Sequence, residues 1–89
     1  MTAYVDYLKT YPSGRWCHLL ADSEEELHKF AELIQKKRST FQVSNNGTPH
    51  YDLTPRQRKK AIENGAKIIN KEKLKEIMGN YSGSYGSYV

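Results

Sequence analysis

The fold is decided by residues 16–34, which read WCHLLADSEEELHKFAELI. Residues 16–21 are almost continuously apolar, as expected for a central strand covered on both faces. Ser23 and Glu26 have the spacing of a helix capping box, and the acidic residues that begin at Glu24 suit the positive end of a helix. An apolar stripe follows at i, i+3, i+4 and i+7, made of Leu27, Phe30, Ala31 and Ile34. This stretch predicts a strand and then an amphipathic helix, closed at its negative end by the basic residues 36–38.

Shorter elements lie on both sides of this stretch. The sequence predicts strands at residues 3–8, 40–43 and 66–69, a second helix at 55–64 closed by Gly65, and a last helix capped by Asn70 and ended by Gly79. The order β-β-α-β-α-β-α predicts a single small α/β domain at residues 1–79, with a partly parallel sheet flanked by helices. Residues 80–89 are rich in Tyr, Gly and Ser, so we expect a disordered tail there.

The composition favours a cytoplasmic protein. Eighty-nine residues suit one domain with a small core. With one cysteine, Cys17, the chain cannot form an internal disulfide, which fits a reducing compartment. No run approaches the roughly 18 apolar residues of a membrane span, and the first residues lack the basic-then-apolar order of a signal peptide. We therefore expect no membrane partner.

The positive charge lies in the second half of the chain. Residues 1–45 hold six basic and six acidic side chains, whereas residues 46–89 hold eight basic and four acidic ones, which accounts for the net charge of +4. The eight are Arg56, Arg58, Lys59, Lys60, Lys67, Lys71, Lys73 and Lys75. Such an excess favours phosphate-bearing partners, although the solvated face of two surface helices has the same composition.

One segment combines three kinds of polar side chain. Residues 49–56 read PHYDLTPR, so His50 and Asp52 share one face if the segment is extended. Thr54 and the proline after it signal the start of a helix, where the backbone amides carry partial positive charge. Imidazole, carboxylate and the Arg56 guanidinium would then lie beside a helix start, which is suited to hold an anionic ligand.

Five short segments are distinctive in combination. They are YVD at residues 4–6, RW-x-HL-x-AD at 15–22, ELH-x-FA at 26–31, HYDL at 50–53 and A-x-x-x-GA at 61–66. On these segments the chain resembles the family called domain of unknown function 4031, over roughly residues 2–78. It departs from the family in a longer and more polar loop before HYDL. The resemblance implies a fold and brings no activity with it. The positions it marks are Asp6, Arg15, Trp16, His18, Asp22, His28, His50, Asp52 and Arg56.

Metal binding is one chemistry open to these positions. Adequate ligands for zinc, manganese or iron are Asp6, His18, Asp22, His50 and Asp52. They are scattered along the chain, and no HxxxH, HExxH or CxxC spacing places two of them on one element. We therefore expect neither a metal nor a cofactor.

Acid–base catalysis is the second chemistry. A carboxylate can orient an imidazole as a general base, which makes His18, His50 and Asp52 candidate catalytic residues of a small hydrolase or transferase. Cys17 is a poor candidate nucleophile, because alternation places it opposite His18 and a buried thiol usually serves packing. Both histidines could equally hydrogen-bond to Asp6 or Asp52 and only pin a strand to a loop.

Ligand capture without chemistry is the function that the sequence favours. We expect a small bacterial or phage accessory protein that binds, and thereby sequesters, a phosphorylated or nucleotide-like ligand. The predicted contacts are Arg15, Trp16, His18, His50, Tyr51, Asp52 and Arg56. Arginines would neutralise phosphate, histidines would donate hydrogen bonds, and Trp16 or Tyr51 would form an apolar wall. A chain this short would shield such a site better as a homo-oligomer.

Binding to DNA or RNA is the alternative. Residues 56–60 place four cations on a predicted helix, and the tail offers Tyr and Gly. At 100° per residue these cations spread around the helix and do not form one stripe facing a groove. The chain also lacks helix-turn-helix, zinc-finger and RNP patterns.

Overall fold

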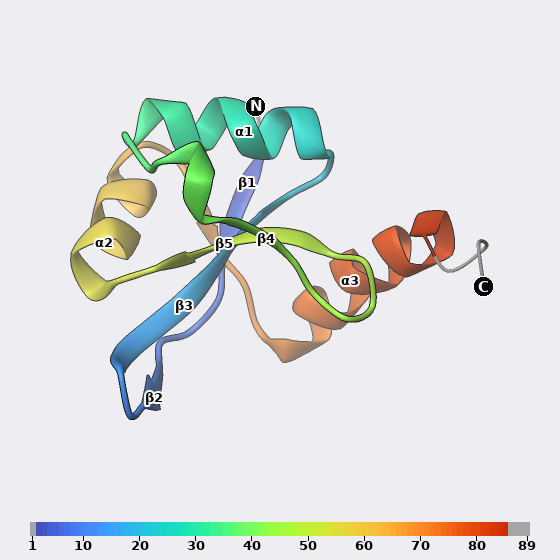
Figure 1. Cartoon of the computed structure of the whole chain (residues 1–89), viewed down its shortest axis with the longest axis horizontal. Coiled ribbons are helices and arrows are strands. Elements are labelled where there is room, and N and C mark those ends of the chain that lie inside the picture. The colour runs from blue at the N-terminus through green and yellow to red at the C-terminus, as the bar shows by residue number, and fades with distance from the viewer. Residues whose placement is uncertain (1, 86–89) are drawn as a thin grey trace.

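The computed structural model describes residues 2–85 as a β-sheet between helices (Figure 1). In chain order the elements are β1 (Ala3–Val5), β2 (Lys9–Tyr11), β3 (Gly14–Ala21), α1 (Glu24–Leu33), the 3-10 turn η1 (Arg38–Thr40), β4 (Phe41–Val43), β5 (Pro49–Leu53), α2 (Pro55–Glu63), β6 (Lys67–Ile68) and α3 (Lys71–Tyr85). The sheet order is β4-β5-β3-β1-β6, with β2 paired to β3 off this path. β1 and β6 pair in parallel, and the other neighbours are antiparallel. The predicted α/β class with a partly parallel sheet is confirmed.

The strands direct alternate side chains into two helical layers. Val5, Leu19 and Leu53 point into the larger core, which α1 and α2 cover. Tyr4 and Leu20 belong to a second cluster with Ile77 and Tyr81 of α3. Figure 1 shows α3 on the side of the sheet away from α1 and α2. The face under α1 and α2 therefore holds the larger core, and α3 covers part of the other face. Within residues 2–85 no helix is both long and apolar enough to cross a membrane.

The predicted starts of α1 and α2 are confirmed. Ser23 Oγ accepts the Glu26 N–H at 3.2 Å. Thr54 and Gln57 form a full capping box, in which the Gln57 N–H donates to Thr54 Oγ1 at 3.3 Å and the Thr54 N–H donates to Gln57 Oε1 at 3.0 Å. These bonds satisfy amides that have no partner within the helices.

The predicted end of α1 at the basic residues 36–38 is wrong. The helix ends at Leu33, and Gln35 adopts a left-handed conformation with φ of 61°. The Lys36 N–H then donates to the Ala31 carbonyl at 2.8 Å, so the backbone itself closes the helix. The chain therefore turns away from the axis of α1 before Lys36.

The sheet contains two strands beyond the predicted order. β2 forms a hairpin with β3, and β5 lies between β3 and β4. The first strand also ends at Val5 and does not reach Leu8. A physical reason is that the Asp6 carboxylate, not a backbone carbonyl, accepts the His18 N–H at 2.6 Å.

Helix α3 does not end at Gly79, as the sequence predicted, but continues through Tyr85. Tyr81 lies in this extension, is buried, and donates its hydroxyl to the Ala21 carbonyl at 2.6 Å. The cap at Asn70 is confirmed, because its Oδ1 accepts the Lys73 N–H at 2.9 Å. Residues 86–89 of the predicted tail lie outside the described residues.

Candidate functional site

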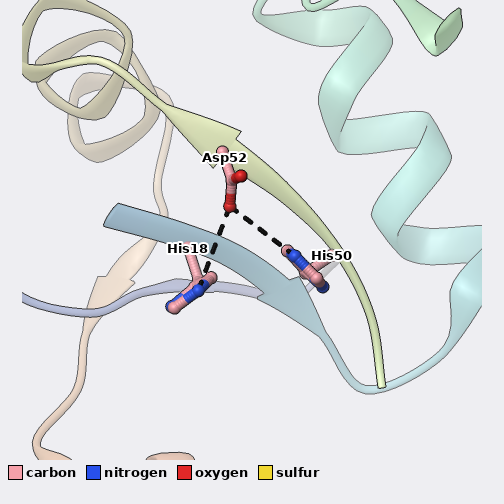
Figure 2. Close-up of side chains that lie close together, drawn as sticks. All are labelled: His18, His50 and Asp52. Carbon is pink, nitrogen blue, oxygen red and sulfur yellow. Dashed lines mark ion pairs between the residues drawn. The ribbon is translucent and has the colours of Figure 1, made fainter. Parts of the chain in front are cut away.

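Two histidines and an aspartate meet beside α3, on the face of the sheet opposite α1 and α2. His18 on β3 pairs directly with Asp52 on β5, and His50 lies two residues before Asp52 on the same face. Figure 2 shows both imidazoles beside the Asp52 carboxylate. Asp52 Oδ1 lies 3.9 Å from His18 Nε2 and 3.6 Å from His50 Nε2. The extended conformation of residues 50–52 confirms that these two side chains share a face.

Asp6 orients the His18 ring through its Nδ1 atom. Its carboxylate is buried and lies 2.7 Å from His18 Nδ1, and its other oxygen accepts the His18 backbone N–H. The hydrogen bond to Asp6 raises the pKa of His18 above its usual value, and the negative charges of Asp6 and Asp52 act in the same direction, against the effect of burial. Because an ionised carboxylate can only accept, Nδ1 carries the ring proton and Nε2 points toward Asp52.

A backbone carbonyl orients the His50 ring in the same way, through Nδ1. Its Nδ1 lies 3.2 Å from the carbonyl oxygen of Thr48, which can only accept a hydrogen bond. The ring is buried and stands edge-on to His18, with 5.1 Å between the centroids. Nδ1 of each ring therefore carries a proton, and Nε2 of each ring faces the same carboxylate oxygen.

A cleft of about 900 Å³ opens over these three side chains. It is lined by Tyr11, Pro12, Ser13, Trp16, Cys17, His18, Lys36, Thr40, Gln42, Ser44, Asn45, His50 and Asp52. One wall comes from the β2–β3 hairpin and the other from β4 and the residues around it. The His18–Asp52–His50 group lies on the floor between them, and a volume of this size accommodates a small organic ligand.

Four of the seven predicted ligand contacts line this cleft, namely Trp16, His18, His50 and Asp52. Arg15 and Arg56 are exposed and do not line it. Tyr51 lies on the other face, fully buried, with its hydroxyl 2.8 Å from His28 Nδ1 under α1. At the start of α2, where the sequence predicts an anion, the capping box already satisfies the N–H groups of Thr54 and Gln57.

Lys36 is a cleft residue that the sequence interpretation missed. The basic run at 36–38 predicts a position at the end of α1, yet Lys36 follows the left-handed turn at Gln35 and lines the cleft. Its Nζ donates to Gln57 Oε1 at 3.2 Å, and burial lowers the pKa of Lys36. A polar Gln-Lys pair directly after the apolar stripe of α1 was the available signal, since a helix often ends where its stripe ends.

Several cations of the basic second half have partners within the fold. The Arg58 Nε donates to the Asp6 carbonyl at 2.9 Å. Lys60 Nζ donates to Gln35 Oε1 at 2.9 Å, and Lys73 lies 3.4 Å from Glu76. The Arg58 and Lys60 contacts join α2 to other parts of the chain, whereas the Lys73–Glu76 pair lies within α3, so part of the excess charge has partners inside the fold.

The comparison with family models matches residues 3–80 to the family described as "Protein of unknown function (DUF4031)". The chain belongs to this family. The match includes strands β3 and β5 and the three polar residues of the cleft floor, His18, His50 and Asp52. No curated protein and no solved structure matches the chain.

Cys17 is expected to resist thiol reagents in the folded protein. It is 2% exposed, and burial raises the pKa of its thiol to about 12, so the reactive thiolate is scarce at neutral pH. We expect iodoacetamide at pH 7.5 to modify Cys17 at least 100-fold more slowly in buffer than in 8 M urea, measured by mass spectrometry. Equal rates in the two conditions would show that β3 does not bury this residue.

Proposed function

We propose that the cleft binds and sequesters a small phosphorylated, nucleotide-like molecule. The observation that carries the proposal is the cleft itself. It joins a half-buried indole, two histidines and a lysine around one open volume. A planar base can stack on Trp16, and the phosphate can reach the polar floor.

The polar groups on the wall suit a ligand with several hydrogen-bonding atoms. Gln42 on β4 lies opposite His50 in the register, and Ser44 and Asn45 follow along the same wall. Lys36 supplies positive charge. This set can recognise sugar hydroxyls and base edges at one end and an anion at the other.

Calorimetry with AMP, ADP, ATP and inorganic phosphate tests the proposal on the whole chain. We expect heat with at least one nucleotide, and a Trp16→Ala variant that binds it about tenfold more weakly because stacking is lost. Arg56→Ala is the matched control. It removes a predicted contact outside the cleft and should leave the affinity unchanged.

Two outcomes would contradict the proposal. The absence of heat with every nucleotide removes sequestration as the function. A loss in Arg56→Ala with no loss in Trp16→Ala places the ligand at the start of α2, outside the cleft. If the protein instead binds oligonucleotides with an affinity that falls steeply as salt rises, the nucleic-acid alternative takes precedence.

Hydrolysis is a second candidate, favoured by one contact. The 2.7 Å distance between Asp6 and His18 Nδ1 is that of an oriented general base, with Nε2 free to take a proton from water. Release of phosphate from a bound nucleotide, and its loss in His18→Gln, would support this reading. An intact nucleotide after prolonged incubation would exclude it.

A further inference from the structure

The lining of the cleft carries little positive charge for a phosphorylated ligand. Among the described residues that line the cleft, Lys36 is the sole lysine and none is an arginine. Lys36 already donates to Gln57. A phosphate on the cleft floor would also lie beside the Asp52 carboxylate, which repels it. Some further positive charge is needed at the floor, close to Asp52.

Three atoms with lone pairs converge at that point. His18 Nε2 and His50 Nε2 lie 3.9 Å and 3.6 Å from Asp52 Oδ1, and one ligand atom from each of the three residues falls within 4.8 Å of the others. In a tetrahedral site with bonds of about 2.0–2.1 Å, ligand atoms lie ~3.3 Å apart. Small rotations of the two imidazoles and of Asp52, whose side chain is 37% exposed, would bring the three atoms to this separation.

The surroundings fix the lone pairs in this orientation. His18 Nδ1 is held by Asp6, and His50 Nδ1 is held by the Thr48 carbonyl. A metal-bound histidine usually donates its second ring N–H to a carboxylate or a carbonyl, which sets the tautomer and orients the ring. Both histidines here have such a partner, although they come from different strands.

A proton explains the arrangement less well than a metal ion. A shared proton would draw Nε2 and Oδ1 together to about 2.7–3.2 Å, whereas both distances are longer than 3.5 Å. At this separation a cation between the three atoms can contact all of them. Two imidazoles with one carboxylate form a ligand set that suits zinc, iron, cobalt or manganese.

We propose that His18, His50 and Asp52 bind one divalent transition-metal ion through Nε2, Nε2 and Oδ1, and that the ion anchors the phosphate of the ligand. Three protein ligands leave a coordination position open to the cleft. Only the contact between the ion and the phosphate rests on the proposed function; the metal site itself does not. In this site His18 Nε2 binds the metal, so His18 cannot act as a general base at the same time.

Zinc titration of the metal-free full chain tests the metal site without any nucleotide. We expect one Zn²⁺ per chain by calorimetry, and Zn²⁺-induced changes in the ¹⁵N shifts of His18 and His50. His28 is an internal control, because it lies under α1 on the other face of the sheet. Asp52→Asn should bind Zn²⁺ at least tenfold more weakly, whereas Glu63→Gln, an exposed carboxylate on α2, should bind it normally.

The outcomes separate the two proposals. No Zn²⁺ binding, equal shift changes at His28, or normal affinity in Asp52→Asn would each overturn the metal site. AMP binding without Zn²⁺ binding overturns the metal site alone. Zn²⁺ binding at His18 and His50, with no AMP heat whether or not zinc is present, supports the metal site and overturns the nucleotide proposal. AMP affinity that rises at least tenfold on adding Zn²⁺ supports both.

Discussion

Replacing Asp6 with Ala is expected to lower the free energy of unfolding by about 3 kcal/mol. The residue is 5% exposed, and its carboxylate accepts from His18 twice, through the backbone N–H and through Nδ1. Alanine leaves both donors without their acceptor at the point where β1 separates from β3. Urea denaturation followed by circular dichroism measures the loss as a lower midpoint.

Asp6→Asn separates stability from the geometry of the site. Its amide oxygen can still accept the His18 N–H, while its NH₂ group faces Nδ1 and moves the ring proton to Nε2. We expect a loss of only about 1 kcal/mol in stability, together with at least a tenfold loss in Zn²⁺ affinity. The ¹⁵N shifts of His18 report the change of tautomer.

A matched control comes from the exposed carboxylate of the same cluster. Asp52→Ala removes a partly solvated carboxylate that lies more than 3.5 Å from both imidazoles, so it should cost no more than about 1 kcal/mol. Equal destabilisation by Asp6→Ala and Asp52→Ala would show that Asp6 has no special structural role. Normal Zn²⁺ affinity in Asp6→Asn would show that Asp6 does not position His18.

The fold was predictable wherever local chemistry decides it. The stripe from Leu27 to Ile34 and the cap at Ser23 depend on neighbours within a few residues, and both are confirmed. The end of α1 was not predictable in this way, because it depends on a left-handed Gln35, a conformation that sequence normally signals with glycine. The place of β5 between β3 and β4 depends on pairing across more than 30 residues of chain.

The sequence predicts which residues could form the candidate site, but it does not predict how His18 lies relative to the other two. His18, His50 and Asp52 stood out as residue types, and the period of a strand placed His50 beside Asp52. The sequence contains no spacing that pairs His18 with Asp52, because the β3–β5 register creates that contact. Tyr51 and Arg56 were selected as neighbours of His50 in sequence, and alternation along β5 sends Tyr51 to the opposite face.

The second large effect is expected at Tyr81, where Ala should cost about 3–5 kcal/mol. Tyr81 is 9% exposed and packs with Tyr4, Leu20 and Ile77 in the smaller core cluster under α3. That cluster covers the sheet beside the cleft floor, and α3 residues Leu74 and Met78 border His18 and His50. Urea denaturation of the full chain gives the loss in the free energy of unfolding.

Two further variants locate the origin of that loss. Tyr81→Phe keeps the ring and removes the hydroxyl bonded to the Ala21 carbonyl, so it should cost about 1–2 kcal/mol. Tyr7→Ala, at a position 60% exposed, should change stability by no more than about 0.5 kcal/mol. If Tyr81→Ala were as mild as Tyr7→Ala, the last turns of α3 would contribute nothing to the domain. If it is severe, the domain continues past Gly79, because the cover of the second sheet face depends on a residue beyond that glycine.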